Sequence, residues 1–437
     1  MVLIVGAGIT GLTIAYLLAK AGIKVLVLEK EKQIGGLAKS FRYGNFTFDI
    51  GPHRFYTHNQ RVLAFIQEIL GEEGKILERQ TAVYFRSRYY SWPLHPQALF
   101  KLPLPLTLRA ARDIFTQGFR SKSRERSFKD YIIRQYGPTL YEVFFRDYTQ
   151  KFLGISSEET HSTWAQMGII KAVIDEKAAP RSLIGLIRMA LFPPAASLKF
   201  IYPKGMMGSF CEILAEKIEK LGGKILVSYP LEKMKISEGE IKTISVQEES
   251  WPVERVIWTA PLTSLCSLLR VSSRGLEYRA ILLYLLEINH PPLLPYQWCY
   301  YGDPKIIFSR VSQPNLFNKL AAPPGRSGLC LEILCQKGDD YWENYQGLKN
   351  RVLSDLIRVG LIEGKEEIIN LHYQRIPEAY PIYHIDYPQR LARIKKDLSR
   401  IRNLVIAGRS GSFWYNNMDE CIEMASEIAS QIIRSKP

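Results

Sequence analysis

The first thirty residues constrain the fold more than any other part of the chain. Val2–Val5 is a short apolar run, as expected for a central parallel strand that is buried on both faces. It leads directly into the glycine-rich segment Gly6–Gly11, and helical spacing follows over Leu12–Ala21. A second apolar strand, Lys24–Leu28, ends in Glu29. The pattern predicts a βαβ unit, which belongs in a parallel sheet with helices on its faces.

Three glycines and one acidic residue give this unit a predicted ligand. Gly6 permits a tight turn, Gly8 lets the backbone approach a pyrophosphate, and Gly11 lets the helix pack close to the strand. The N-terminus of the helix offers free N–H groups and the positive end of its dipole to phosphates. Glu29 follows Gly11 by eighteen residues and can accept hydrogen bonds from a ribose diol. The segment therefore predicts a dinucleotide site.

Length, charge and cysteine usage set the broad class of protein. The 437 residues predict two or three structural domains, and the 46% apolar share is ordinary for a globular chain. The formal charge of +15 indicates a solvated basic surface, an anionic substrate or an anionic membrane surface. Nucleic acid is disfavoured because no recognition motif accompanies the charge. The six cysteines form no CxxC pair, which gives no metal signal and fits a reducing compartment.

The sequence lacks two features that would direct a protein to or through a membrane. No basic leader precedes the first strand, and no apolar run reaches the roughly 18–20 residues that a spanning helix needs. We therefore expect a cytoplasmic protein. The basic amphipathic stretch Leu106–Arg126 leaves open a peripheral contact with the inner face of the membrane. The oligomeric state is left open.

A second glycine pair follows the acidic residue. The segment Glu31–Ser40 contains Gly35-Gly36, and it resembles the extended motif of the amine-oxidase-like flavoproteins. In that family the corresponding loop covers the ribose and pyrophosphate of the cofactor. The resemblance implies that the dinucleotide is FAD rather than NAD.

Four later segments are similar to one branch of the same family. The turn Gly51–Phe55 looks like the segment that lies against the isoalloxazine ring. Its histidine resembles the branch of UDP-galactopyranose mutase and bacterial protoporphyrinogen-oxidase-like proteins. Lys199–Phe210, Val256–Pro261 and the Gly408–Asp419 segment, with its Gly-Arg, Tyr and Met-Asp pattern, are similar to the same branch.

The resemblance implies an α/β fold, with a Rossmann-like FAD-binding domain of the GR2 type, an inserted helical domain and a mostly antiparallel sheet over the substrate. The FAD-binding domain is predicted to comprise residues 1–78, 199–268 and 397–437. Residues 96–195 are predicted to form a helical cap, and 79–95 with 269–396 the substrate sheet.

The motif and the resemblance together predict a set of cofactor-binding residues. These are Gly6, Gly8, Ile9, Thr10, Gly11, Glu29, Lys30, Gly36, Leu37, Ala38, Gly51, Pro52, His53, Val227, Ala260, Gly408, Arg409, Asn417, Met418 and Asp419. No metal ligand is predicted.

Five side chains are candidates for the chemistry. Three roles are open for His53: an acid/base, a hydrogen-bond partner of the flavin, or a packed residue of the turn. Arg54 is the next residue and is the second candidate. Arg310 ends a strand where the mutase-like enzymes place an arginine on the substrate diphosphate; its alternative is a surface arginine. Tyr383 and Tyr415 are expected near the nucleotide-sugar pocket, or in the core.

Three functions remain open on the sequence. The first is an FAD-dependent oxidoreductase that acts at flavin N5 on a bulky organic substrate, which the large helical region favours. The second is a redox-neutral enzyme of the UDP-galactopyranose mutase type that uses reduced FAD on a nucleotide-diphosphate sugar; Arg310 and the basic charge favour it. The third is a lipid-binding chaperone resembling Rab GDP-dissociation inhibitors, against which the retained glycines and Glu29 argue.

Overall fold

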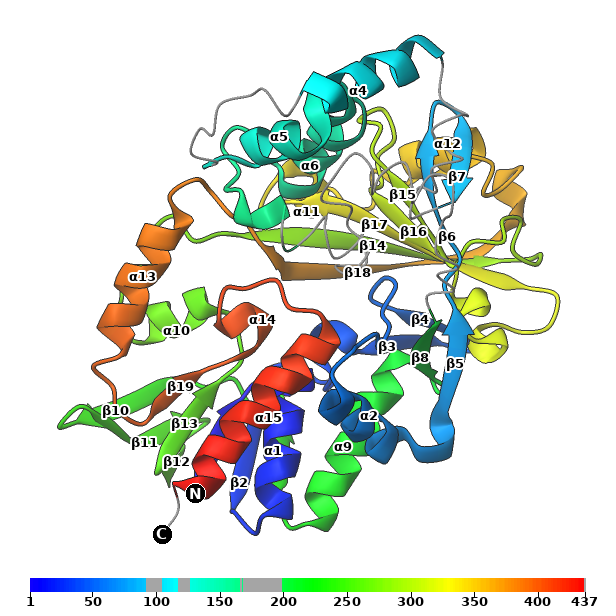
Figure 1. Ribbon diagram of the computed structural model, residues 1–437. Helices are drawn as coiled ribbons and strands as arrows, with labels where there is room; N and C mark the ends of the chain where they lie inside the picture. The colour runs from blue at the N-terminus through cyan, green and yellow to red at the C-terminus, as the bar shows by residue number, and fades with distance from the viewer. Residues whose placement is uncertain (92–103, 117–125, 166, 168–198, 436–437) are drawn as a thin grey trace.

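The computed structural model describes residues 1–91, 104–116, 126–165, 167 and 199–435. Figure 1 shows two main layers in this part of the chain. A parallel sheet with helices against it contains both termini of the described chain. An antiparallel sheet lies across the carboxyl ends of its strands, and a group of helices covers the opposite side of that second sheet.

The parallel sheet collects strands from distant parts of the sequence. Its spatial order is β19-β13-β1-β2-β9, and every neighbouring pair is parallel. The strands are β1 (Val2–Val5), β2 (Val25–Glu29), β9 (Lys224–Val227), β13 (Arg255–Trp258) and β19 (Leu404–Ile406). β1 is central and buried along its whole length, as its uninterrupted apolar sequence predicts.

Three long helices cover one face of the parallel sheet. They are α1 (Ile9–Lys20), α9 (Met207–Lys220) and α15 (Met418–Arg434). α1 packs against both of the others, and Figure 1 shows the three side by side. α1 begins at Ile9, earlier than the predicted Leu12, because the glycine-rich segment itself forms the first helical turn.

Smaller elements surround this layer. The short strands are β3 (Ser40–Tyr43), β4 (Phe46–Asp49), β5 (Gly74–Glu78), β8 (Lys199–Pro203), β10 (Lys233–Ser237), β11 (Glu240–Val246) and β12 (Glu249–Pro252). The accompanying helices are α2 (Gln60–Leu70), α10 (Leu262–Leu268), α13 (Tyr387–Leu398) and α14 (Gly408–Gly411).

The second sheet has the order β18-β14-β17-β16-β15-β6-β7. Its strands are β6 (Thr81–Phe85), β7 (Arg88–Ser91), β14 (Tyr278–Ile288), β15 (Trp298–Tyr301), β16 (Arg310–Ser312), β17 (Ser327–Cys335) and β18 (Ile368–Pro381). All neighbouring pairs are antiparallel except β15 and β6. Helices α11 (Asp340–Glu343) and α12 (Lys349–Arg358) accompany it.

The helical region comprises α4 (Leu104–Thr116), α5 (Phe128–Leu140), the π-helical turn η4 (Tyr141–Phe145) and α6 (Arg146–Leu153). Gly137 interrupts α5 with a φ of +84°, where a Cβ atom would lie 2.6 Å from the Cβ of Asp113. Much of the predicted cap, residues 96–103, 117–125 and 168–195, lies outside the described residues, as does most of the basic end of Leu106–Arg126.

The predicted fold class is confirmed, whereas the domain boundaries stay a prediction. The prediction that Arg310 ends a strand was wrong, because Arg310 is the first residue of β16. The preceding loop turns because the amine of Lys151 binds the carbonyl oxygens of Tyr301, Asp303 and Phe308. No helix that the structure describes combines the length and apolarity needed to cross a bilayer.

Candidate active site

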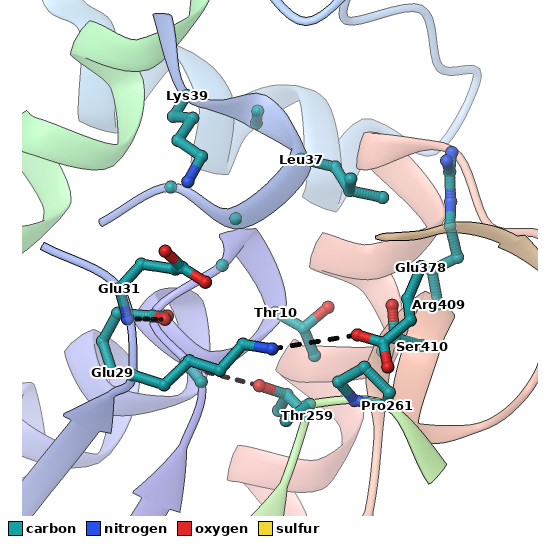
Figure 2. A pocket seen from close by; sticks show the side chains of 18 of the residues that line it. Thr10, Glu29, Glu31, Leu37, Lys39, Thr259, Pro261, Glu378, Arg409 and Ser410 are labelled. Atoms are coloured by element: carbon teal, nitrogen blue, oxygen red, sulfur yellow. Dashed lines mark hydrogen bonds and ion pairs between the residues drawn. The ribbon is translucent and has the colours of Figure 1, made fainter. Parts of the chain in front are cut away.

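A cavity of about 370 Å³ lies where the strands of the parallel sheet end. Its walls include the carboxyl ends of β1 and β2, the segment after β13 and the segment after β19. Gly35 and Gly36 close it from another side, and residues Gln374–Glu378 of β18 cross it from the second sheet. This is the edge at which open α/β sheets bind ligands. Figure 2 shows the side chains that face the cavity.

The three glycines of the first turn differ in what surrounds them. Gly6 has a φ of +103°, and a Cβ atom there would lie 2.6 Å from Oγ1 of Thr259. A Cβ atom on Gly11 would lie 2.0 Å from the carbonyl oxygen of Gly6. The nearest atom to a Cβ on Gly8 is 4.0 Å away, and Gly8 lines the cavity. The first and third glycines therefore serve the fold, whereas the second leaves space for a ligand.

Glu29 is a buried carboxylate at the edge of the cavity. One oxygen accepts a hydrogen bond from the N–H of Ala7 at 2.8 Å, and the other accepts one from the N–H of Glu31 at 3.0 Å. Figure 2 shows this second bond. Each carboxylate oxygen has a further acceptor position, so Glu29 can also accept from a ribose hydroxyl.

The unpaired polar groups of the cavity fit a dinucleotide. None of the described side chains caps the N-terminus of α1, where N–H groups suit a pyrophosphate. Asn416 lines the cavity and is 4% exposed, yet its Nδ2 atom has no hydrogen-bond partner among the described residues. A buried amide donor in this state indicates a missing acceptor. The N–H groups at the start of α1 would hold the phosphates of FAD, Glu29 would accept from a ribose hydroxyl, and Asn416 would donate to an acceptor atom of the cofactor.

His53 lies in the same cavity as a neutral imidazole. Burial, together with the positive charges of Arg409 and Arg310, lowers its pKa to about 3. Its Nδ1 atom lies 3.4 Å from the carbonyl oxygen of Gly51. A histidine that stays uncharged at physiological pH cannot act as a cationic acid, so this geometry favours the hydrogen-bond interpretation.

A second cavity, of about 290 Å³, lies between the helical region and the antiparallel sheet. Its walls are mainly aromatic: Tyr84, Phe85, Phe144, Phe145, Tyr148, Phe152, Trp164, Tyr300 and Tyr415. The Nε1 atom of Trp164 is buried without a partner in the described chain. Arg409, which lines the first cavity, stacks 4.5 Å from the ring centroid of Tyr415. The two cavities therefore share a wall.

Arg310 lines this second cavity but is already paired. Its Nε atom donates to Glu332 at 2.6 Å and its Nη2 atom donates to the other carboxylate oxygen at 2.7 Å. The same Nη2 lies 3.1 Å from the hydroxyl of Tyr380. Since Glu332 is 1% exposed, the pair forms a nearly neutral unit inside the protein.

A model for flavin containing amine oxidoreductases matches residues 9–433. The chain belongs to this family. The match confirms the predicted flavin cofactor and the family that the glycine pairs and the Gly408–Asp419 segment resemble.

Relatives of this flavoenzyme include both mutases and oxidases. The dTDP-fucopyranose mutase of Escherichia coli is 28% identical over 172 residues, which cover 36% of this chain and 43% of that mutase. A probable UDP-galactopyranose mutase of Klebsiella pneumoniae is 30% identical over 165 residues, which cover 36% and 42%. The chain thus matches less than half the length of each of these relatives.

Solved structures share the fold over almost the whole flavoenzyme. Reduced UDP-galactopyranose mutase has a TM-score of 0.84 at 21% identity, covering 99% of this chain and 93% of that one. Wild-type putrescine oxidase bound to putrescine has a TM-score of 0.66 at 17% identity, covering 99% and 98%. At these identities the likeness establishes the fold.

Most of the predicted cofactor-binding residues of the flavoenzyme lie together. The first cavity is lined by Gly6, Gly8, Ile9, Thr10, Glu29, Lys30, Gly36, Leu37, Ala38, His53, Ala260, Gly408, Arg409 and Met418. The predicted residues that do not line it are Gly11, Gly51, Pro52, Val227, Asn417 and Asp419. Next to Val227, the lining is supplied instead by Tyr229–Leu231.

The five catalytic candidates do not lie in one cavity. Tyr415 and Arg310 line the aromatic cavity, and His53 lines the cofactor cavity. Tyr383 lines neither of the two; its buried hydroxyl accepts a hydrogen bond from the N–H of Tyr415 at 2.7 Å, which makes it a positioning residue. Arg54 is not among the residues that line either of these two cavities, and its guanidinium lies over the ring of Trp298.

Sequence reasoning missed three groups of lining residues. Gln374–Glu378 come from a strand that we had not predicted, and the aromatic walls come from several elements. Asn416 lies within the Gly408–Asp419 segment, so its amide could have been included. The density of aromatic residues in Phe128–Arg146 was the signal for the second cavity.

Proposed function

We propose that this flavoenzyme catalyses the redox-neutral ring contraction of a nucleotide-diphosphate sugar, with its flavin in the reduced state. The observation that carries the proposal is the aromatic cavity that shares the wall of Arg409 and Tyr415 with the cofactor cavity. A substrate in the aromatic cavity would thereby reach the cofactor without leaving the protein.

The aromatic walls suit a nucleobase. Side chains such as Tyr148 and Phe144 offer flat faces on which a planar ring stacks, and the Nε1 atom of Trp164 offers a donor. Two relatives support this choice of substrate class, since they are named as mutases of a dTDP-sugar and a UDP-sugar.

A bound reduced FAD would supply a nucleophilic N5 atom towards the anomeric carbon of the sugar. The chain would contribute positioning and exclusion of water. Neutral His53 would hold the substrate or the ring through a hydrogen bond. Tyr380 and Tyr415, stacked with ring centroids 5.7 Å apart, would close the shared wall against solvent.

Oxidation of a bulky organic substrate is a second candidate. Glu332 neutralises Arg310, so the side chain that was expected to bind a diphosphate carries little free charge into the cavity. The mostly aromatic walls would also accept an apolar ring system. The protein shares its fold with putrescine oxidase, which supports an oxidase as the second candidate.

The two candidates differ in their electron balance. The FAD-loaded protein is prepared in two forms, oxidised and reduced with dithionite. Each form is incubated with UDP-galactopyranose or dTDP-fucopyranose, and the sugar nucleotides are then separated by chromatography. We expect furanose products from the reduced protein alone, with no net consumption of reductant. Hydrogen peroxide formed from an amine or a porphyrinogen, with both sugar nucleotides unchanged, would instead establish the oxidase.

A further inference from the structure

Helix α4 exposes leucine side chains on its outer face. Leu104 is 70% exposed and Leu108 is 61% exposed. Ala111, which is also exposed, continues the same face at helical spacing. Figure 1 shows α4 at the outer edge of the helical region, far from the parallel sheet. Because a helix of a soluble protein normally directs its leucines towards the core, an outward apolar face indicates a binding partner.

The opposite face of α4 fixes this orientation. Ala110 is 7% exposed and Asp113 is 3% exposed. The carboxylate of Asp113 accepts hydrogen bonds from the N–H of Thr139 at 3.0 Å and from its hydroxyl at 2.6 Å. A Cβ atom on Gly137 would lie 2.6 Å from the Cβ of Asp113, so α4 and α5 are in close contact here. Packing and hydrogen bonds on this side therefore keep the leucines on the outside.

The exposed charges of α4 are all positive. Arg109 and Arg112 are exposed, whereas Asp113, the one acidic residue of the helix, is buried. The guanidinium of Arg112 lies 3.9 Å from the carboxylate of Asp113, but 78% of its side chain is exposed. The formal charge of +15 on the whole chain acts in the same direction at longer range. The partner is therefore expected to combine an apolar layer with negative charge.

An anionic lipid bilayer meets both requirements. Leucines can enter the boundary of the acyl chains, while the long arginine side chains keep their charged ends at the lipid phosphates. A second copy of this chain fits less well. A symmetric contact through α4 would bring Arg109 and Arg112 of one copy against the same residues of the other, and like charges repel.

We propose that α4 is the docking surface of this flavoenzyme for an anionic membrane, with Leu104 and Leu108 in the interface and Arg109 and Arg112 on lipid phosphates. The helix would lie in the plane of the interface, since its 13 residues span about 20 Å, less than the thickness of a bilayer core. No residue of α4 lines either of the two cavities described above, so this inference does not rest on the proposed function.

The test is flotation of FAD-loaded protein with lipid vesicles at two salt concentrations. The vesicles contain phosphatidylcholine alone or with about a third of phosphatidylglycerol. The wild type should float only with the anionic vesicles, and less so at high salt. Leu108→Ser should weaken binding about tenfold, because one leucine no longer enters the interface. Arg109→Gln combined with Arg112→Gln should weaken it about thirtyfold at low salt and remove most of the salt dependence.

Two matched variants outside α4 are the controls. Leu320→Ser removes a leucine that is 83% exposed in the turn Lys319–Ala321, and Arg88→Gln removes an exposed arginine of β7. Both should float as the wild type does, and an intact flavin spectrum shows that each variant is folded. Wild-type protein that stays in the soluble fraction, or binding that the α4 variants leave unchanged, would overturn the inference. Dimers that form without lipid and that Leu108→Ser separates in analytical ultracentrifugation would also overturn it, because the face would then join two copies.

Discussion

The three glycines of the first turn look alike in the sequence but have different neighbours in the fold. Gly11 leaves no room for a side chain, because a Cβ atom would meet the carbonyl oxygen of Gly6 at 2.0 Å. Gly8 has open space beside it, and that space belongs to the cofactor cavity. The same substitution should therefore have different consequences at the two positions.

We expect Gly11→Ala to lower the free energy of unfolding of the cofactor-free protein by about 1–3 kcal/mol, as overpacking does. Gly8→Ala should leave the stability of the cofactor-free protein almost unchanged and weaken FAD binding, since the methyl group enters the space of the pyrophosphate. Urea unfolding of the apoprotein and fluorescence titration with FAD measure the two effects. Equal loss of stability in both variants would contradict this division of roles.

Asp49 at the end of β4 is a buried carboxyl that joins three elements. It accepts hydrogen bonds from Ser40 Oγ at 2.5 Å, from the hydroxyl of Tyr202 at 2.5 Å and from the N–H of Met207 at 3.2 Å. Burial raises its pKa to about 6, although these hydrogen bonds act in the opposite direction.

The raised pKa of Asp49 predicts a pH dependence. The folded state binds this proton more tightly than the unfolded state, so the contribution of Asp49 to stability is complete below about pH 4 and is lost as the pH rises to about 6. The difference in unfolding free energy between the wild type and Asp49→Asn should therefore fall by about 2–3 kcal/mol over that range. Denaturant unfolding across the range checks it, and parallel stability curves would contradict it.

At the scale of elements, one lysine joins the helical region to the antiparallel sheet. The amine of Lys151 in α6 donates to the carbonyl oxygens of Tyr301, Asp303 and Phe308 at 2.7–3.0 Å. Burial lowers its pKa to about 7. The loop before β16 thus depends on a side chain from another layer for its shape.

Lys151→Met should leave three carbonyl groups without their donor and destabilise the protein by about 1–3 kcal/mol. Hydrogen exchange in the loop between β15 and β16 should become faster. Lys129→Met is the matched control, because Lys129 lies in the same helical region and pairs with Glu158 at the surface. An effect of equal size in both variants would mean that the three carbonyl contacts contribute nothing specific.

The elements of the fold differ in how far they could be predicted from the sequence. β1 could be predicted because burial on both faces leaves an uninterrupted apolar run, and the glycine turn because its backbone conformation is local. β18 could not be predicted, since His372, Gln374 and Arg375 interrupt any apolar pattern, and Gln374–Glu378 line the cavity. The aromatic stretch Phe128–Arg146 indicated only part of the second cavity, because its walls come together when the helical region packs on the sheet.

At the scale of the whole molecule, the cofactor cavity draws on both sheets. Gly6–Thr10 form the turn after β1 and the start of α1, and Gln374–Glu378 belong to β18 of the other sheet. Lys30 follows β2 and Glu378 belongs to β18; both line the cavity, with 3.8 Å between their charged atoms. A ligand there touches both layers at once.

FAD should therefore stabilise the protein as one cooperative unit. At a free concentration about a thousandfold above its Kd, the cofactor should add about 4 kcal/mol to the free energy of unfolding. Hydrogen exchange should slow in Gly6–Thr10 and in Gln374–Glu378 together, and Gly8→Ala should lose both effects. Protection confined to the first segment would show that the second sheet does not take part in cofactor binding.

The order of strands in the parallel sheet has a consequence for biosynthesis. β1 is made before its neighbour β13, which lies more than 250 residues later, and β19 and the residues up to Cys421 come later still. A ribosome-bound chain that holds only the glycine turn has an incomplete cavity. We therefore expect cofactor loading to follow translation of α15, and until then the nascent chain depends on other means to keep the edge of β1 from aggregating.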